Sequence, residues 1–92
     1  MVYLIAYDLN KPGQQYQELY AEIKDLGDWL HCMESVWLVD AYLKEHQIRK
    51  RLEACLDAND KLLVAKICKG LEMQLPEEDQ EWIADHMGSN PY

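Results

Sequence analysis

Asp8 is the residue whose position most clearly invites chemistry, because it is a carboxylate that directly follows an apolar run over residues 2–7. Asn10 lies two positions further on, where the turn-forming residues 10–13 begin. Hard cations such as Mg²⁺ prefer oxygen ligands and often use only one or two protein carboxylates together with water. Asp8 and Asn10 are therefore candidate metal ligands, and Asp8 is a candidate catalytic residue. The competing interpretation is structural, since an Asp here also accepts N–H bonds from a following turn.

Three further residues have side chains that can contact the phosphates of a nucleic acid. Ser35 offers a hydroxyl group where a β-favouring run begins, and Arg49 and Arg51 flank Lys50 in a basic triplet. Adjacent helical residues do not share a face, so the triplet forms no single basic stripe. Each residue also has a structural interpretation. The Ser35 hydroxyl can bond locally, and the basic side chains can pair with acids on the same helix, such as Glu53.

The histidines and cysteines form no recognisable catalytic or metal-binding motif. The three cysteines are widely spaced and include no C-x-x-C, which argues against a disulfide framework and against a zinc site. We expect them to be reduced thiols packed inside the protein. His31 and Cys32 are adjacent, so in a strand they would point to opposite faces. No Ser-His-Asp spacing and no Gly-rich phosphate loop can be found.

The net charge argues against strong binding to nucleic acid. The chain has 17 acidic and 9 basic residues, a formal net charge of −8. Affinity for nucleic acid depends largely on Lys and Arg side chains that neutralise phosphates. The bulk charge therefore disfavours a nucleic-acid partner, although it leaves room for a local basic patch, and it suits contact with another protein.

The length and hydropathy of the chain predict one small domain that does not span a membrane. Ninety-two residues supply a single thin core, so pairing with a second copy would add stability. No apolar run approaches the ~18 residues of a membrane span. The first residues lack the basic region and cleavage site of a signal peptide, so we expect a cytoplasmic protein.

The periodicity of apolar residues predicts strands and helices in alternation. The first helix is indicated by apolar residues at helical spacing from Tyr16 to Leu26, with Gly27 as its stop. A short fifth strand is indicated by Leu71, Met73 and Leu75, which alternate with polar residues. The predicted elements, in order, are a strand over 2–7, a helix over 16–26, strands over 29–33 and 35–41, a helix from 44, strands over 61–69 and 71–75, and a helix starting at 76.

This order predicts an α+β fold, a ferredoxin-like βαββαβ sandwich with an extra C-terminal strand and helix. The ferredoxin-like domain would occupy residues 1–75, including the fifth strand over 71–75. Residues 76–92 would form the C-terminal helix and tail. The first strand is internal in such a sheet, which agrees with the apolar character of both its faces.

The tyrosines and tryptophans allow two interpretations. The chain has six Tyr and three Trp but no Phe. Tyr and Trp join apolar area to a polar group, so they suit protein contact surfaces as well as cores. Both interpretations stay open for Tyr3, Tyr7, Trp29, Trp37 and Trp82.

Three short motifs, with the length and the order of elements, resemble the CRISPR-associated protein 2 family and the related SinR-like small proteins. The resemblance covers roughly residues 2–75. It rests on the Tyr-Asp-aliphatic end of the first strand, the Gly that closes the first helix, and the Ser-Val-aromatic step into the third strand. These motifs are Tyr7-Asp8-Leu9, Gly27 and Ser35-Val36-Trp37.

The resemblance implies a homodimer of ferredoxin-like protomers with facing sheets. In that family the strand after the fourth completes the partner's sheet, a role that would fall to Leu71, Met73 and Leu75 as dimer-interface residues. The family's strand-end Asp, here Asp8, would meet its twin across the dimer axis and help hold a divalent metal such as Mg²⁺. Some members of this antiviral defence family are metal-dependent endonucleases and others are non-catalytic bridges.

Three features depart from the family pattern. Met33 stands where the family usually has Gln, the chain is acidic where DNA-binding members carry basic ridges, and the terminal helix bears Trp82. Two hypotheses follow. The first is a small CRISPR-adaptation-like protein, a homodimeric metal-dependent endonuclease that acts on nucleic-acid phosphodiesters. The second is a non-catalytic, acidic protein-binding module on the same fold, such as a regulator, an inhibitor or an antitoxin-like partner.

Overall fold

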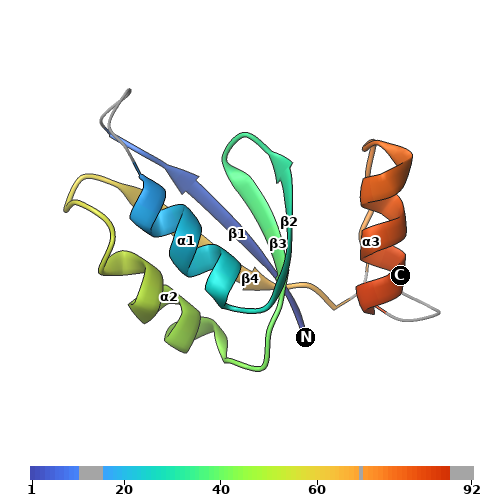
Figure 1. Ribbon diagram of the computed structural model, residues 1–92, viewed down its shortest axis with the longest axis horizontal. Coiled ribbons are helices and arrows are strands. Elements are labelled where there is room, and N and C mark those ends of the chain that lie inside the picture. The colour runs from blue at the N-terminus through green and yellow to red at the C-terminus, as the bar shows by residue number, and fades with distance from the viewer. Residues whose placement is uncertain (11–15, 69, 88–92) are drawn as a thin grey trace.

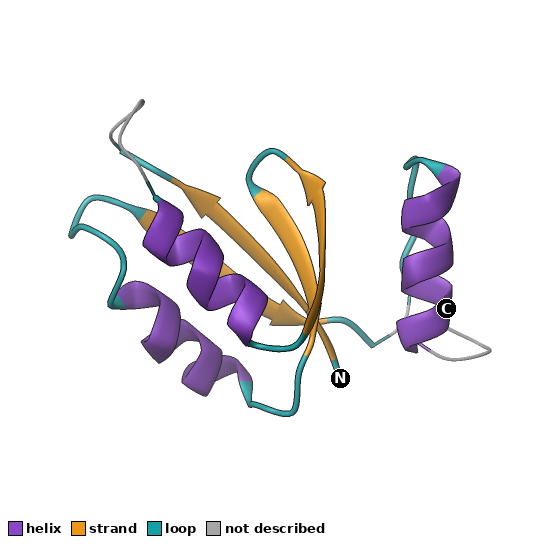
Figure 2. Ribbon diagram, in the orientation of Figure 1, coloured by secondary structure: helices purple, strands orange, loops and turns teal. Residues whose placement is uncertain are grey.

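The chain forms four strands and three helices in the order β1–α1–β2–β3–α2–β4–α3 (Figures 1 and 2). The computed structural model describes residues 1–10, 16–68 and 70–87. The elements are β1 (Val2–Asp8), α1 (Gln17–Asp25), β2 (Asp28–Met33), β3 (Val36–Asp40), α2 (Glu45–Glu53), β4 (Lys61–Lys66) and α3 (Glu77–Met87). The predicted α+β class is confirmed.

The strands form one antiparallel sheet in the order β2-β3-β1-β4. β1 is internal, as its apolar character on both faces predicted, and it pairs with β3 on one side and β4 on the other. Helices α1 and α2 both pack on one face of the sheet (Figure 1). Each helix therefore connects two strands that lie on either side of a third strand.

The main core fills the layer between the sheet and helices α1 and α2. Tyr3, Ile5 and Tyr7 face this layer because alternate residues of a strand share a face. The helices contribute residues spaced three to four positions apart, which form one stripe on each helix. They are Leu19 and Ile23 from α1 and Ile48 and Leu52 from α2, all completely buried.

A second, smaller cluster lies on the other face of the sheet. Val2 and Leu38 point to that face and are covered by Ile83 of α3. Trp82 and Met87 of the same helix pack at its rim. The predicted C-terminal helix is thus confirmed, and its apolar side covers part of the sheet.

The predicted fifth strand forms no backbone ladder with any other described part of the chain. Residues 71–75 have no strand assignment, although their exposure alternates as in an extended segment. Leu71, Met73 and Leu75 pack against the Val2–Leu38–Ile83 cluster. β4 ends earlier than predicted, at Lys66, and the chain then crosses to this face of the sheet instead of running beside β4. A strand that pairs with a partner's sheet stays a prediction.

Gly27 allows the chain to pass closely from α1 into β2. A Cβ atom at this position would overlap the main-chain carbonyl of Asp40. Because the obstacle is backbone, it cannot rotate away as a side chain could. The predicted helix stop therefore has a second role, the close approach of this connection to the end of β3.

A bulge interrupts the pairing of edge strand β2 with β3. His31 pairs with Trp37 and Met33 pairs with Val36, so the register shifts across Cys32. An extra residue of this kind turns the following side chains to the other face. Met33 therefore shares a face with Val36, on the side of the sheet away from α1 and α2.

Candidate functional site

Asp8 lies at the end of β1 on the face of the sheet away from α1 and α2. Its Cα partner in the register of β4 is Lys61. Both residues line a shallow depression of about 360 Å³, together with Ala6, Tyr7, Leu62 and Leu63. Asp8 is exposed, so its carboxylate is accessible to a cation or a ligand. The proximity of Lys61 was not predicted from the sequence, although antiparallel pairing of the first and fourth strands could have indicated it.

The structural interpretation of Asp8 finds no support among the described residues. The backbone N–H of Asn10 donates to Asp60 Oδ1 at 2.7 Å and not to Asp8. No other described group donates a hydrogen bond to the Asp8 carboxylate. Residues 11–13, the rest of the predicted turn, lie outside the described residues. Asn10 itself is exposed and adjoins the same end of the sheet.

Ser35 also lies at this end of the sheet, in the turn between β2 and β3. Its main-chain carbonyl accepts the Tyr7 N–H at 3.1 Å. The Tyr7 hydroxyl accepts a hydrogen bond from Trp37 Nε1 at 3.0 Å and donates to the Glu34 carbonyl at 3.4 Å. Burial raises the pKa of the Tyr7 hydroxyl, so it stays protonated. Tyr7 and Trp37 are core residues, and they brace the strand end that presents Asp8.

The predicted nucleic-acid contacts Arg49 and Arg51 lie apart from Asp8, on helix α2 at the opposite face of the sheet. Arg49 forms an ion pair with Glu53 at 2.7 Å along the helix. Arg51 instead reaches across to α1 and pairs with Glu22 at 2.8 Å and Asp25 at 3.1 Å. Both guanidinium groups are therefore already matched by carboxylates, so the structure does not assemble them with Asp8 and Ser35 into one site.

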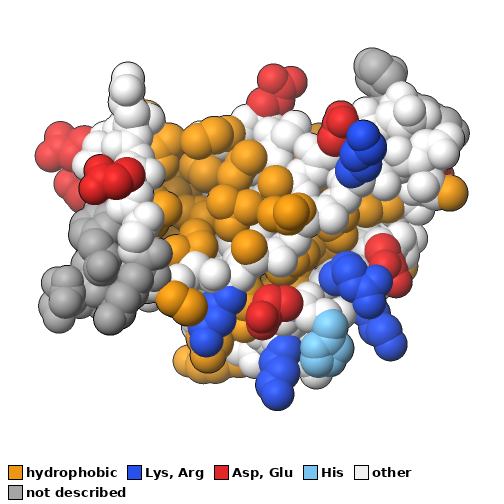
Figure 3. Space-filling view, turned by 180° about the vertical axis from the view of Figure 1, so that it is seen from behind, with side chains coloured by type: hydrophobic (Ala, Val, Ile, Leu, Met, Phe, Trp, Pro, Cys, Tyr) orange, Lys and Arg blue, Asp and Glu red, His pale blue; other side chains and the backbone are white. Residues whose placement is uncertain are grey.

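The face that carries Asp8 is largely apolar and remains uncovered beside α3 (Figure 3). We call this surface the open face and define it by six side chains that alternate with core-facing residues. They are Leu4, Ala6, Met33, Val36, Leu63 and Ala65. Leu63 is 58% exposed and Met33 is 54% exposed. A contiguous exposed apolar surface of this kind is typical of a contact surface for another protein.

The aromatic residues divide between the two interpretations left open by the sequence. Tyr3, Tyr7 and Trp37 are buried in the main core. Trp29 is 41% exposed on edge strand β2, where Lys24 lies over its ring. Trp82 of α3 is half-buried and packs against the Val2–Leu38–Ile83 cluster.

The cysteines and histidines agree with the sequence analysis in most respects. His31 stacks on Trp37 in one layer, while Cys32 packs on the other face. Cys32 and Cys55 are half-buried, and burial raises the pKa of each thiol. Cys68 is exposed, so the expectation that all three thiols are packed inside was wrong. Cys68 follows the end of β4, where the chain has left the sheet.

No cluster of three or more His, Cys, Asp or Glu residues suitable for a metal ion occurs in ranges 1–10, 16–68 and 70–87. Of the residues in these ranges, one copy offers the predicted ligands Asp8 and Asn10 at this site. None of the helices in these ranges has the length and hydropathy to cross a lipid bilayer.

A solved structure shares this arrangement of elements. The chain is similar to the crystal structure of a hypothetical protein TT1823 from Thermus thermophilus, with a TM-score of 0.59 and 24% sequence identity over 79% of this chain and 88% of that chain. At this identity the similarity establishes the fold and nothing about activity. No family model matches the sequence.

Proposed function

We propose that this chain is a ferredoxin-like, CRISPR-adaptation-like protein that works as a homodimer with facing sheets. The strand order β2-β3-β1-β4, with two helices on one face, supports the ferredoxin-like class. The exposed apolar open face supports the dimer, because a second copy would remove Leu63 and Met33 from water. Both proteins in such a pair would bury the same surface.

We further propose that the dimer is a metal-dependent endonuclease in which Asp8 of each copy holds one divalent cation, such as Mg²⁺. The observation that carries this proposal is the place of Asp8. It is exposed, accepts no hydrogen bond from the described residues, and lies on the open face beside Leu63. A dimer formed through this face would bring two such carboxylates to the interface. Carboxylate pairs fit a hard cation, and Asn10 offers a further oxygen.

The remaining chemistry at this position belongs to Lys61 and to the metal. A bound divalent cation would stabilise negative charge on a phosphodiester. Lys61 lines the same depression, and its positive charge would attract the phosphate to it. Tyr7 and Trp37 hold the end of β1 rigid and so keep Asp8 in position.

Hydrolysis of labelled DNA and RNA by the purified protein tests the endonuclease proposal. We expect cleavage with Mg²⁺ or Mn²⁺ and none with EDTA. Asp8→Asn should lower the rate by about 100-fold or more, as removal of a group that acts on developing charge does. Asp85→Asn on α3 is the matched control, since it makes the same change at an exposed site, and it should retain activity. Equal rates for Asp8→Asn and the natural protein would overturn the role of Asp8.

Light scattering tests the dimer separately from the chemistry. Leu63→Glu places a charge on the open face, on edge strand β4, and should yield monomers. Tyr42→Glu is the control, because Tyr42 is completely exposed in the connection between β3 and α2. A natural protein that is monomeric at micromolar concentration would refute the homodimer.

A second candidate function is a non-catalytic protein-binding module. The observation that favours it is the pairing of Arg49 with Glu53 and of Arg51 with Glu22 and Asp25, which leaves the two arginines little charge to offer a nucleic acid. The net charge of −8 points the same way. On this proposal the open face binds a different protein.

Fluorescence anisotropy with labelled oligonucleotides distinguishes the two candidates. If the protein is an endonuclease, we expect Asp8→Asn to bind the probe, because this variant should cleave it only slowly. The binding-module proposal expects no binding at physiological salt from a protein that is folded by circular dichroism.

A further inference from the structure

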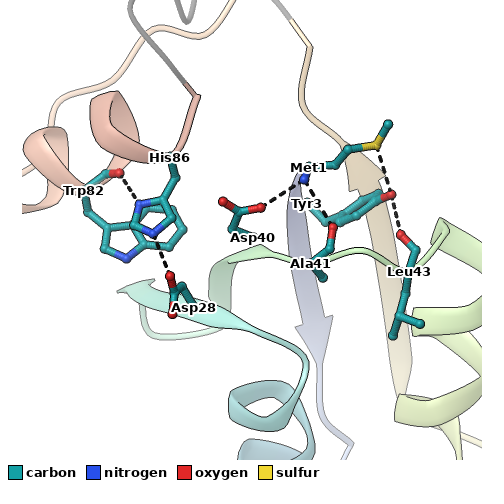
Figure 4. Close-up of polar contacts among 8 residues, drawn as sticks. All are labelled: Met1, Tyr3, Asp28, Asp40, Ala41, Leu43, Trp82 and His86. Carbon is teal, nitrogen blue, oxygen red and sulfur yellow. Dashed lines mark hydrogen bonds and ion pairs between the residues drawn. The ribbon is translucent and has the colours of Figure 1, made fainter.

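His86, in the last turn of α3, is held between two hydrogen-bond acceptors (Figure 4). Its Nδ1 lies 2.7 Å from the main-chain carbonyl oxygen of Trp82, and its Nε2 lies 3.2 Å from Oδ2 of Asp28. A neutral imidazole carries one N–H and can donate to only one of them. The imidazolium carries two and donates to both. The geometry therefore favours the protonated form.

The surroundings of the ring also favour positive charge. The His86 ring stacks on the indole of Trp82, with centroids 3.8 Å apart and planes 16° apart, and an aromatic face attracts a cation. The C-terminal end of a helix carries partial negative charge, and this favours a cation such as protonated histidine in the last turn.

The charged groups that face His86 from the sheet are acids. They are Asp28 of β2 and Asp40 at the end of β3, and the α-amino group of Met1 pairs with Asp40 at 2.9 Å. Burial of the ring lowers the pKa of His86, but the bonds to Trp82 and Asp28 and the charge of Asp40 outweigh it. The pKa is therefore raised above its usual value.

The contact between His86 and Asp28 links α3 to the sheet. In the described ranges it is the one polar side-chain contact between that helix and a strand. The rest of the attachment is apolar, through Ile83, Trp82 and Met87 packed on Val2 and Leu38.

We propose that His86 is a pH-dependent latch that holds α3 on the sheet beside the open face. Protonated His86 bridges the helix to Asp28, and loss of its proton removes one of the two bonds. Release of α3 uncovers Val2 and Leu38 and so enlarges the apolar surface available for contact. The proposal is independent of any catalysis by Asp8.

The direction of the pH dependence follows from the raised pKa. A histidine whose pKa is higher in the folded protein stabilises the fold fully below its unfolded pKa, which is about 6.5. That stabilisation is lost as the pH rises through the folded pKa. Attachment of α3 should therefore be tightest near pH 6 and weaken on the alkaline side of neutrality.

Two NMR measurements on the full chain test the latch. The first is the titration of the His86 ring in the natural protein, in Asp28→Asn, and in the urea-unfolded chain. We expect the midpoint to be highest in the natural protein and lower in Asp28→Asn. A natural-protein midpoint equal to or below that of the unfolded chain would overturn the proposal, and it does so whether or not any variant keeps α3 in place.

The second measurement is amide hydrogen exchange in α3 at pH 6 and pH 8.5, corrected for the intrinsic rate. We expect protection to fall by about two- to fivefold over this range, the size expected of an ion pair with an exposed carboxylate. His86→Phe keeps a ring against Trp82 and should abolish the pH dependence, while His46→Gln on α2 should leave it unchanged. A pH dependence that survives in His86→Phe would refute the latch, as would its absence in the natural protein.

Discussion

At the scale of single residues, the Tyr7 side chain contributes both to the core and to the hydrogen bonds beside the candidate site. Its ring fills the main core, and its hydroxyl accepts the Trp37 Nε1–H and donates to the Glu34 carbonyl. Trp37 is 1% exposed, so its N–H has no access to water. The residue directly before Asp8 therefore fixes the strand end from the opposite side of the sheet.

Tyr7→Phe should lower the free energy of unfolding by about 1–3 kcal/mol, because it leaves the buried indole N–H without an acceptor. Urea unfolding followed by circular dichroism measures the change. Tyr42→Phe makes the same substitution at a completely exposed position and should cost nothing measurable. Equal stability of the two variants would contradict the role assigned to this hydrogen bond.

The sequence predicted which residues have reactive chemistry, but it did not predict their neighbours. Asp8 was predicted at the end of the first strand because the apolar run ends there. Its proximity to Lys61 depends on which strands pair. Arg51 forms ion pairs with acids on α1 and not with those on its own helix. These contacts are set by tertiary packing, which short-range spacing does not encode.

At the scale of elements, the connection between α1 and β2 passes very close to the end of β3. Gly27 has no Cβ, which lets it lie against the main-chain carbonyl of Asp40. The periodicity of apolar residues predicted both helices of the main layer and the C-terminal helix to within a few residues. Apolar residues recur in these helices at three- and four-residue spacing, and this spacing is the pattern that indicates an amphipathic helix.

Gly27→Ala should destabilise the fold by about 1–3 kcal/mol, since neither backbone segment has room to move aside. Gly70→Ala is an informative comparison, because a Cβ atom at Gly70 would meet no atom within 4 Å. This substitution is unfavourable only because Gly70 has a left-handed backbone conformation, with φ +74°. Both variants are measured by urea unfolding and by amide NMR. Gly27→Ala should shift the amide resonances of Asp40 and Ala41, and Gly70→Ala should leave them in place.

The predicted fifth strand shows why element prediction from periodicity has a limit. Leu71, Met73 and Leu75 do alternate in burial, as the pattern indicated. Their burial comes from packing on α3 and the sheet face, and no strand in the described ranges pairs with them. The alternation of apolar and polar residues indicates that one side of a segment is buried, but it does not indicate what covers that side.

At the scale of the whole molecule, the sheet separates two apolar layers of unequal size. The layer beneath α1 and α2 is the larger and includes most of the fully buried side chains. The layer beneath α3 is smaller and adjoins the uncovered open face. We therefore expect the helix α3 to detach before the main layer unfolds.

A matched pair of substitutions tests this order. Ile48→Ala in the main layer should lower the global free energy of unfolding by about 2–5 kcal/mol. Ile83→Ala in α3 should instead reduce the hydrogen-exchange protection of α3 and leave that of β1 nearly unchanged. Both isoleucines are almost fully buried, at 0% and 1% exposure, so burial alone does not distinguish them. An equal loss of β1 protection in both variants would show a single cooperative unit.

The two edges of the sheet differ in a way that bears on aggregation. The bulge at Cys32 breaks the regular spacing of amides along edge strand β2, whereas β4 pairs with β1 in unbroken register from Tyr3 to Asp8. Fibrils grow when a sheet can accept new strands at both edges. A molecule with only one regular edge can pair with a single neighbour, and growth then stops. Deletion of Cys32 removes the bulge and makes the β2 edge regular, so it should promote fibril formation.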